Sequence, residues 1–244
     1  MTEERKTNTK EFEKLMKYIK KMHDRYTFAI YSFYAWESLQ ELKAPNVVGQ
    51  DKAEENLDII KKYNSFFASA EESLRIHFFL ELAKIFDNSN QSLHVDKIIN
   101  ITESNINNLT VEEFKEYNKN QDRAFAKELV EKYKRIEYSD IKDLREIRNK
   151  HSDSIEKLKI YRNKWLAHDD IKKPEPPGIN PAEIKSLFKI ILKILNLISG
   201  KLNNEKWMYN HVEDGVKDDT YSIVDNLRKF ELYRKKEIRD DLEV

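Results

Sequence analysis

The scarcity of glycine and proline is the feature that most limits the folds open to this chain. Its 244 residues contain four Gly and five Pro, which gather at a few places instead of recurring at the short intervals that strands and hairpins require. Between them, apolar residues recur every three or four positions, the spacing of an amphipathic α-helix. The sequence therefore predicts an all-α protein, a helical bundle with long antiparallel helices.

Helix boundaries follow from the residues that interrupt this spacing. The first helix is expected over about 9–42 and ends before Pro45. A capping box of Thr110 and Glu113 opens a helix that extends to about Ile136. The other expected helices cover about 52–86, 95–101, 181–202 and 219–236, together with one that restarts at 139 or 140 and either continues through 151–154 or breaks there.

The chain is interpreted as one helical domain, 1–244, with a Pro-rich linker at 172–181. Asn180, Pro181 and Glu183 form a strong helix start after that linker. The helix that follows is apolar on most faces, which predicts a central core helix or an interface helix. Because such a helix is too apolar to stand alone, the C-terminal core helices at 181–236 are assigned to the same domain.

The composition of the chain excludes several classes of function and partner. Lys plus Arg equals Asp plus Glu at 44 each, so net charge gives no argument for a nucleic acid or a membrane as partner. The absence of Cys excludes disulfides and thiolate chemistry and fits a reducing compartment. The N-terminal residues are charged where a signal peptide would be apolar, and the longest apolar run, 190–198, is far shorter than the roughly 20 residues that span a bilayer. We expect a soluble, cytoplasmic protein with no membrane contact and no cofactor.

One segment has residues that suggest a specific chemistry. It is Tyr161–Asp170, which reads YRNKWLAHDD. Arg162 and Asn163 are followed by four residues and then His168, an order that resembles the signature of the HEPN ribonuclease family. The spacing alone is weakly specific, because Arg145 and His151 have the same separation. That second pair lacks the Arg-Asn start and the Ala-His ending.

A second segment, Leu80–Ile99, resembles the HEPN subgroup associated with abortive phage infection. Members of that subgroup have a Leu-rich helix ending in Phe-Asp, then a short polar loop and a Ser-Leu pair. Phe86, Asp87, Ser92 and Leu93 occupy those places here. The HEPN-like region therefore extends over about 52–170.

The resemblance implies a helical bundle, a homodimer that brings two motifs together, and metal-independent cleavage of RNA by an endoribonuclease of toxin or phage-defence type. An antitoxin protein would be a further partner. In this role His168 is the acid-base group, Arg162 stabilises charge on the phosphate, and Asn163 holds the helix end or a phosphate oxygen. The chemistry is reasonable, since His titrates near neutral pH and the guanidinium of Arg matches phosphate oxygens.

Helix geometry sets a condition on this interpretation. In an ideal helix, Arg162 and His168 are separated by about 9 Å of rise and about 120° of rotation, so they do not share a face. Either the helix loosens near His168, or a dimer completes the site. Local charge gives modest support, because residues 142–164 contain eight basic and four acidic side chains.

Two other interpretations stay open. The chain could be a non-catalytic helical module that binds a protein or RNA partner, with Arg162 paired to a nearby carboxylate. A metal-dependent hydrolase is less favoured, because no carboxylate pair falls on one buried helix face. Tyr161, Trp165 and Leu166 are expected to be core residues, and the histidines outside the motif are expected to be ordinary surface or core residues.

Overall fold

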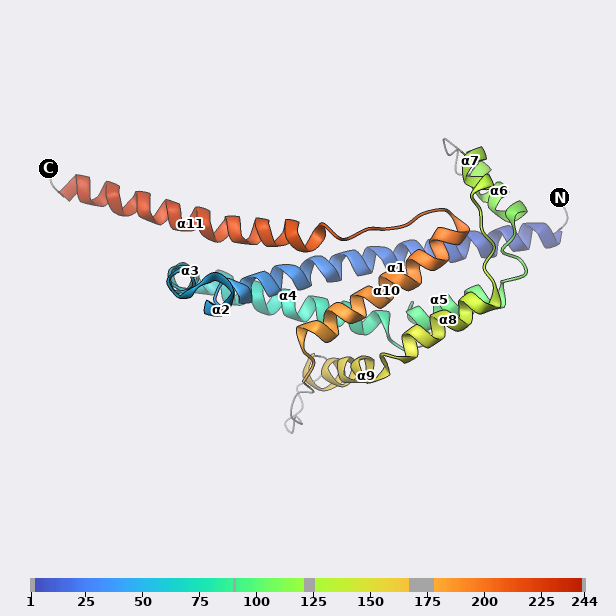
Figure 1. Ribbon diagram of the computed structural model, residues 1–244, viewed down its shortest axis with the longest axis horizontal. Helices are drawn as coiled ribbons and strands as arrows, with labels where there is room; N and C mark the ends of the chain where they lie inside the picture. The colour runs from blue at the N-terminus through green and yellow to red at the C-terminus, as the bar shows by residue number, and fades with distance from the viewer. Residues whose placement is uncertain (1–2, 90, 121–125, 167–177, 243–244) are drawn as a thin grey trace. The chain divides into compact units, whose positions relative to one another are not determined.

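The computed structural model describes residues 3–89, 91–120, 126–166 and 178–242, and helix is the only regular secondary structure in those ranges (Figure 1). The all-α prediction is confirmed. The chain groups into two compact units, which are described separately. Unit 1 comprises residues 1–28 and 79–207, and unit 2 comprises residues 29–78 and 208–244. No helix in the described ranges combines the length and apolar character needed to cross a membrane.

Unit 1 is built around α10, Pro181–Leu202, most of whose apolar side chains are buried. Tyr26 of α1 (Glu3–Glu41) meets Phe188 edge-on, with ring centroids 5.7 Å apart. The apolar faces of α10 are thus covered within the chain, so this helix is a core helix. The other elements of unit 1 are the end of α4 (Asn64–Ile85), α5 (Val95–Ser104), α6 (Val111–Asn120), α7 (Ala126–Glu131), α8 (Tyr138–Asn149), α9 (Ser152–Tyr161) and a π-helical turn (Arg162–Leu166).

The start of α10 has the predicted capping box. Asn180 Oδ1 accepts from the backbone N–H of Glu183 at 2.9 Å, and Glu183 Oε2 accepts from the backbone N–H of Asn180 at 2.9 Å. These bonds satisfy donors that a helix start otherwise leaves unpaired. Lys157 of α9 also donates to Glu183, at 2.7 Å, which ties α9 to the beginning of α10.

Unit 2 contains α1 from Ala29 onward, α2 (Pro45–Val48), α3 (Gln50–Lys62), α4 as far as Phe78, and α11 (Val212–Leu242). Its core includes Leu42 of α1, Ile60 of α3, Phe67 of α4 and Val224 of α11. Burial of one apolar face from each helix accounts for the packing of these four elements.

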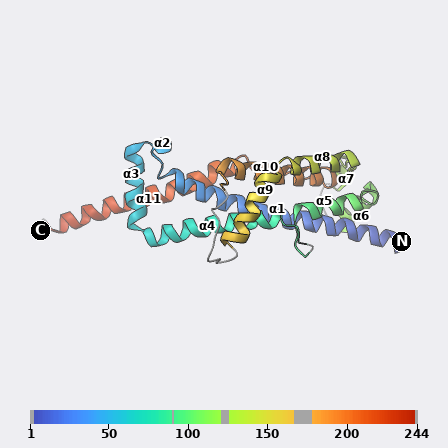
Figure 2. The same cartoon turned by 90° about the horizontal axis from the view of Figure 1, so that it is seen from below.

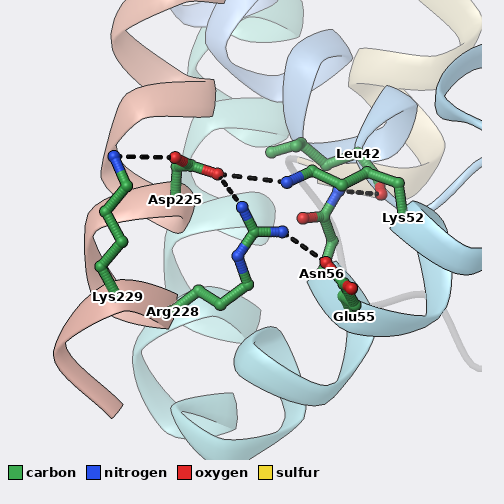
Figure 3. A network of polar contacts seen from close by, with 7 residues as sticks. All are labelled: Leu42, Lys52, Glu55, Asn56, Asp225, Arg228 and Lys229. Atoms are coloured by element: carbon green, nitrogen blue, oxygen red, sulfur yellow. Dashed lines mark hydrogen bonds and ion pairs between the residues drawn. The ribbon is translucent and has the colours of Figure 1, made fainter. Parts of the chain in front are cut away.

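Polar contacts cover one side of this core (Figure 3). Asp225 of α11 lies between Lys52 of α3, at 3.1 Å, and Lys229, at 3.2 Å, and it also pairs with Arg228. Arg228 also forms an ion pair with Glu55 of α3 at 2.5 Å, which is a second link between α11 and α3. Because most of these side chains are partly exposed, the network aligns the two helices more than it stabilises them.

The expected helix over about 52–86 is wrong as a single helix. It breaks at Tyr63, whose backbone angles are φ −107° and ψ 33°, so that α3 and α4 are separate. The hydroxyl of Tyr63 donates to Glu231 of α11 at 2.6 Å. Packing of α3 against α11 therefore overrides an apolar spacing that continues across the break.

The expected helix over about 110–136 is also too long. Helix α6 ends at Asn120 and α7 at Glu131, and residues 133–137 are not helical. Tyr133 donates its hydroxyl to the carbonyl of Leu109 at 2.5 Å, and the N–H of Lys134 donates to the carbonyl of Lys201 at 3.0 Å. The second of these bonds uses a backbone N–H that a continuing helix would direct to its own carbonyl four residues earlier.

The remaining boundaries agree more closely. The chain breaks between α8 and α9, and His151, at φ −117°, occupies the N-cap position of α9. The alternative of a continuous helix through 151–154 is thereby excluded. The last helix, α11, extends beyond the expected 219–236 at both ends.

Candidate functional site

The motif begins where α9 ends. After Tyr161 the helix widens into the π-helical turn Arg162–Leu166. Such turns are rare and occur often at functional sites. The helix is thus already widened at Arg162, while the loosening expected near His168 stays a prediction. His168 lies outside the described residues, as do Asp169 and Asp170.

Two neighbours hold the guanidinium of Arg162. Its Nη1 lies 3.4 Å from Oδ2 of Asp87, and its Nε donates to Oδ1 of Asn163 at 2.9 Å. The structure therefore brings together two of the three predicted site residues, Arg162 and Asn163. The Arg162 side chain keeps 23% of its surface exposed, so an anion in solution has access to it.

Asp87 follows the last turn of α4. Its Oδ1 accepts from the backbone N–H of Asn88 at 2.8 Å. Burial raises the pKa of Asp87, but the N–H of Asn88 and the positive charge of Arg162 outweigh burial and hold this pKa below its ordinary value of 3.8. Asp87 is therefore an anion at neutral pH, and it orients Arg162.

Replacement of Asp87 by Asn is expected to make the fold less sensitive to acid. Because the folded-state pKa is depressed, ionised Asp87 contributes stability that is present above about pH 3.8 and is lost as pH falls through the lowered pKa. Thermal unfolding followed from about pH 6 to about pH 2 should show a larger loss of Tm in the wild type than in Asp87→Asn. Asp58→Asn, at an exposed position, is the control, and an equal loss in wild type and Asp87→Asn would contradict the assignment.

The loop that carries Asp87 is anchored from α1. Arg25 donates to the carbonyl of Leu93 at 3.0 Å and lies 3.1 Å from Glu81 of α4. Phe86, at 2% exposure, fills the core beneath the loop. These contacts give a physical reason for the Phe-Asp and Ser-Leu pairs of the second resemblance, because the pairs mark the two ends of the loop that places Asp87 beside Arg162.

Tyr161, directly before Arg162, packs against α4. Its ring lies 4.5 Å from that of Phe79 on α4, at an interplanar angle of 33°. This contact places α9 beside the end of α4 (Figure 2). Tyr161, Trp165 and Leu166 are half-buried, so the prediction that they are core residues holds only in part.

The second Arg and His pair has a different setting. Arg145 of α8 donates to Asn100 at 2.9 Å and to Glu103 at 2.5 Å, so it binds α8 to α5. His151 occupies the start of α9. The side chain of His151 forms no capping hydrogen bond there. His94 does have a structural role, since its Nδ1 accepts from the backbone N–H of Lys97 and caps α5.

Sequence reasoning missed the contacts that position the motif. Arg25 and Phe79 are ordinary helix residues in the sequence, and nothing in their spacing marks them. Asp87 carried a signal, because it belongs to the segment that resembles the abortive-infection subgroup. Its pairing with Arg162 depends on α4 and α9 lying side by side, which is a tertiary property.

Comparison with known proteins identifies the family. A family model described as AbiU2, of the HEPN class, matches residues 11–220. No curated protein matches the chain, and no solved structure matches it. The matched residues include both segments on which the resemblance was based, and they cover well over half of the 244 residues. The chain therefore belongs to the AbiU2 family of HEPN proteins, a family associated with abortive infection.

Proposed function

We propose that this protein is a metal-independent endoribonuclease of toxin or phage-defence type. The 2′-OH of the RNA attacks the adjacent phosphorus, and the bond from phosphorus to the 5′ oxygen breaks. His168 takes the proton from the 2′-OH and returns one to the leaving 5′ oxygen. Arg162 stabilises the charge that develops on the phosphate oxygens. The products are a 2′,3′-cyclic phosphate and a 5′-OH.

The observation that carries the proposal is the placement of Arg162. Its guanidinium is partly exposed at a helix end, in a π-helical turn, and Asp87 and Asn163 restrict its orientation. A cation held in place before the substrate arrives loses little free energy to reorganisation during the reaction. Membership of the HEPN class supports the same reaction.

The proposal includes a homodimer in which two motifs face one RNA. The buried apolar faces of α10 remove one reason to expect such a dimer. The remaining reason is the separation of Arg162 and His168 along the helix, which a second copy of the motif would offset. The same proposal includes an antitoxin protein that covers the motif around Arg162.

The first test is cleavage by the wild-type protein. Incubation with total RNA in excess EDTA should yield fragments that end in a 2′,3′-cyclic phosphate, detected by their resistance to 3′ ligation until the cyclic end is removed. Abolition of cleavage by EDTA, or a 3′-OH product, would contradict attack by the 2′-OH without a metal.

A second candidate is a non-catalytic helical module that binds RNA or a protein. The ion pair of Arg162 with Asp87 favours it, because a paired guanidinium has less charge to offer a phosphate. The two candidates differ in one measurement. Purified protein that binds RNA but cuts none under any condition tried would exclude the ribonuclease and leave the module.

A further inference from the structure

Lysines surround a hollow of about 540 Å³ in unit 1, at the C-terminal end of α10. The segment between α7 and α8 passes this end of the helix, where the N–H of Lys134 donates to the carbonyl of Lys201. Among the residues that the structure describes, the rest of the lining is uncharged. Its lysines are Lys132, Lys134, Lys193, Lys201 and Lys206.

Most of these ammonium groups are not paired with a carboxylate in the described part of the chain. Lys201 is paired with Asp140 at 2.5 Å. The side chains of the other four are exposed and form no ion pair with any described residue. Like charges held close together repel one another, and this repulsion is relieved when an anion enters. In a chain with as many acidic as basic residues, such a cluster is a local feature and not a result of overall charge.

The wall of the hollow is held in place by side-chain contacts. Asn196 of α10 donates to the carbonyl of Trp207 at 2.8 Å and accepts from its backbone N–H at 2.8 Å. This pair fixes the loop that carries Lys206 against α10. Gly200 faces the stem of Lys206 so closely that a Cβ there would lie 3.1 Å from Cε of Lys206. The stem of Lys206 therefore lies against α10 at Gly200.

The basic surface continues along α10. Lys185, Lys189 and Lys193 follow one another at intervals of four residues, which places them on one ridge of the helix. The only acidic residue of α10 is Glu183, in its first turn. This row of lysines along α10 leads to Lys193, which lines the hollow.

The ridge begins next to the motif helix. Glu183 is bound by Lys157 of α9, and α9 ends immediately before Arg162. Between Glu183 and Lys201 the helix rises about 27 Å, and Figure 1 shows α10 leading away from α9. The hollow thus lies several nucleotides away from the motif.

We propose that the lysine hollow binds the phosphate backbone of single-stranded RNA and holds the strand several nucleotides from the motif. Lysine ammonium groups contact phosphates as point charges and read no base, so this site selects RNA length and not sequence. The inference rests on the proposed function in so far as RNA is the ligand. It adds a substrate-binding site that lies apart from Arg162.

The test is a binding measurement that does not depend on cleavage. A fluorescent single-stranded RNA with 2′-O-methyl groups throughout cannot be cut by 2′-OH attack, and its binding is followed by anisotropy over a range of salt concentrations. Each lysine contact removed should make the negative slope of log K against log salt shallower by about 0.7, and should weaken binding roughly fourfold at 0.15 M salt. The variant carries four substitutions, Lys132→Gln, Lys134→Gln, Lys193→Gln and Lys206→Gln.

The control variant loses the same charge at exposed lysines elsewhere. It carries Lys61→Gln, Lys115→Gln, Lys235→Gln and Lys236→Gln, all at exposed positions. Weaker binding and a smaller slope only in the hollow variant support the site. Unchanged binding in the hollow variant, equal loss in both variants, or no binding by the wild type overturns it. Specific binding without any cleavage would leave the hollow standing while the ribonuclease proposal fails.

Discussion

Replacement of Arg162 or His168 by Ala is expected to reduce RNA cleavage by about 100-fold or more. Loss of His168 removes the group that moves both protons, and loss of Arg162 leaves the developing phosphate charge without its cation. Arg162→Lys should recover only part of the activity, because an ammonium group keeps the charge but lacks the planar fork. Initial rates on a fluorogenic RNA, in EDTA, measure all of these variants.

The double variant tests whether the two residues serve one step. If they do, Arg162→Ala combined with His168→Ala should cost little more than the larger of the two single losses. Arg145→Ala and His151→Ala provide the internal control, because that pair has the same spacing and its Arg joins α8 to Glu103 of α5. Their cleavage should stay close to that of the wild type. A His168→Ala protein that cuts RNA as fast as the wild type would end the ribonuclease proposal.

The parts of the fold that could be predicted are those that depend on neighbours in sequence. The capping box of Asn180 and Glu183 involves residues three apart, and the structure contains it as expected. The break at Tyr63 could not be predicted in this way, since the hydroxyl of Tyr63 reaches Glu231, which lies far along the chain. The end of the helix near Glu131 depends in the same way on the long-range bond from Lys134 to Lys201.

In the candidate site, too, the features set by sequence neighbours could be predicted and those set by long-range contacts could not. Arg162 and Asn163 were recognised because the motif is contiguous, and their mutual hydrogen bond is local. Asp87 could be named from the second resemblance, but its role as the partner of Arg162 follows only from the packing of α4 against α9. The role of His168 stays a prediction.

Replacement of Phe79 by Ala is expected to lower the free energy of unfolding of unit 1 by about 3 kcal/mol or more, because a buried ring is removed and a cavity remains. Phe79 is 6% exposed, and it is the residue on which Tyr161 packs. Phe28, which also belongs to unit 1 but is 65% exposed, supplies the matched control, and Phe28→Ala should change stability by about 0.5 kcal/mol or less.

Urea denaturation followed by tryptophan fluorescence measures this loss in unit 1 itself. Trp165 and Trp207 lie in unit 1 and Trp36 in unit 2, so a Trp36→Phe background restricts the signal to the unit that carries the motif. Because Phe79 supports the residue that precedes Arg162, Phe79→Ala should also slow RNA cleavage at urea concentrations below its unfolding transition. Phe79→Leu, which refills part of the cavity, should recover much of both properties. Loss of stability without any loss of cleavage would show that the contact of Phe79 with Tyr161 holds the fold together but does not position Arg162.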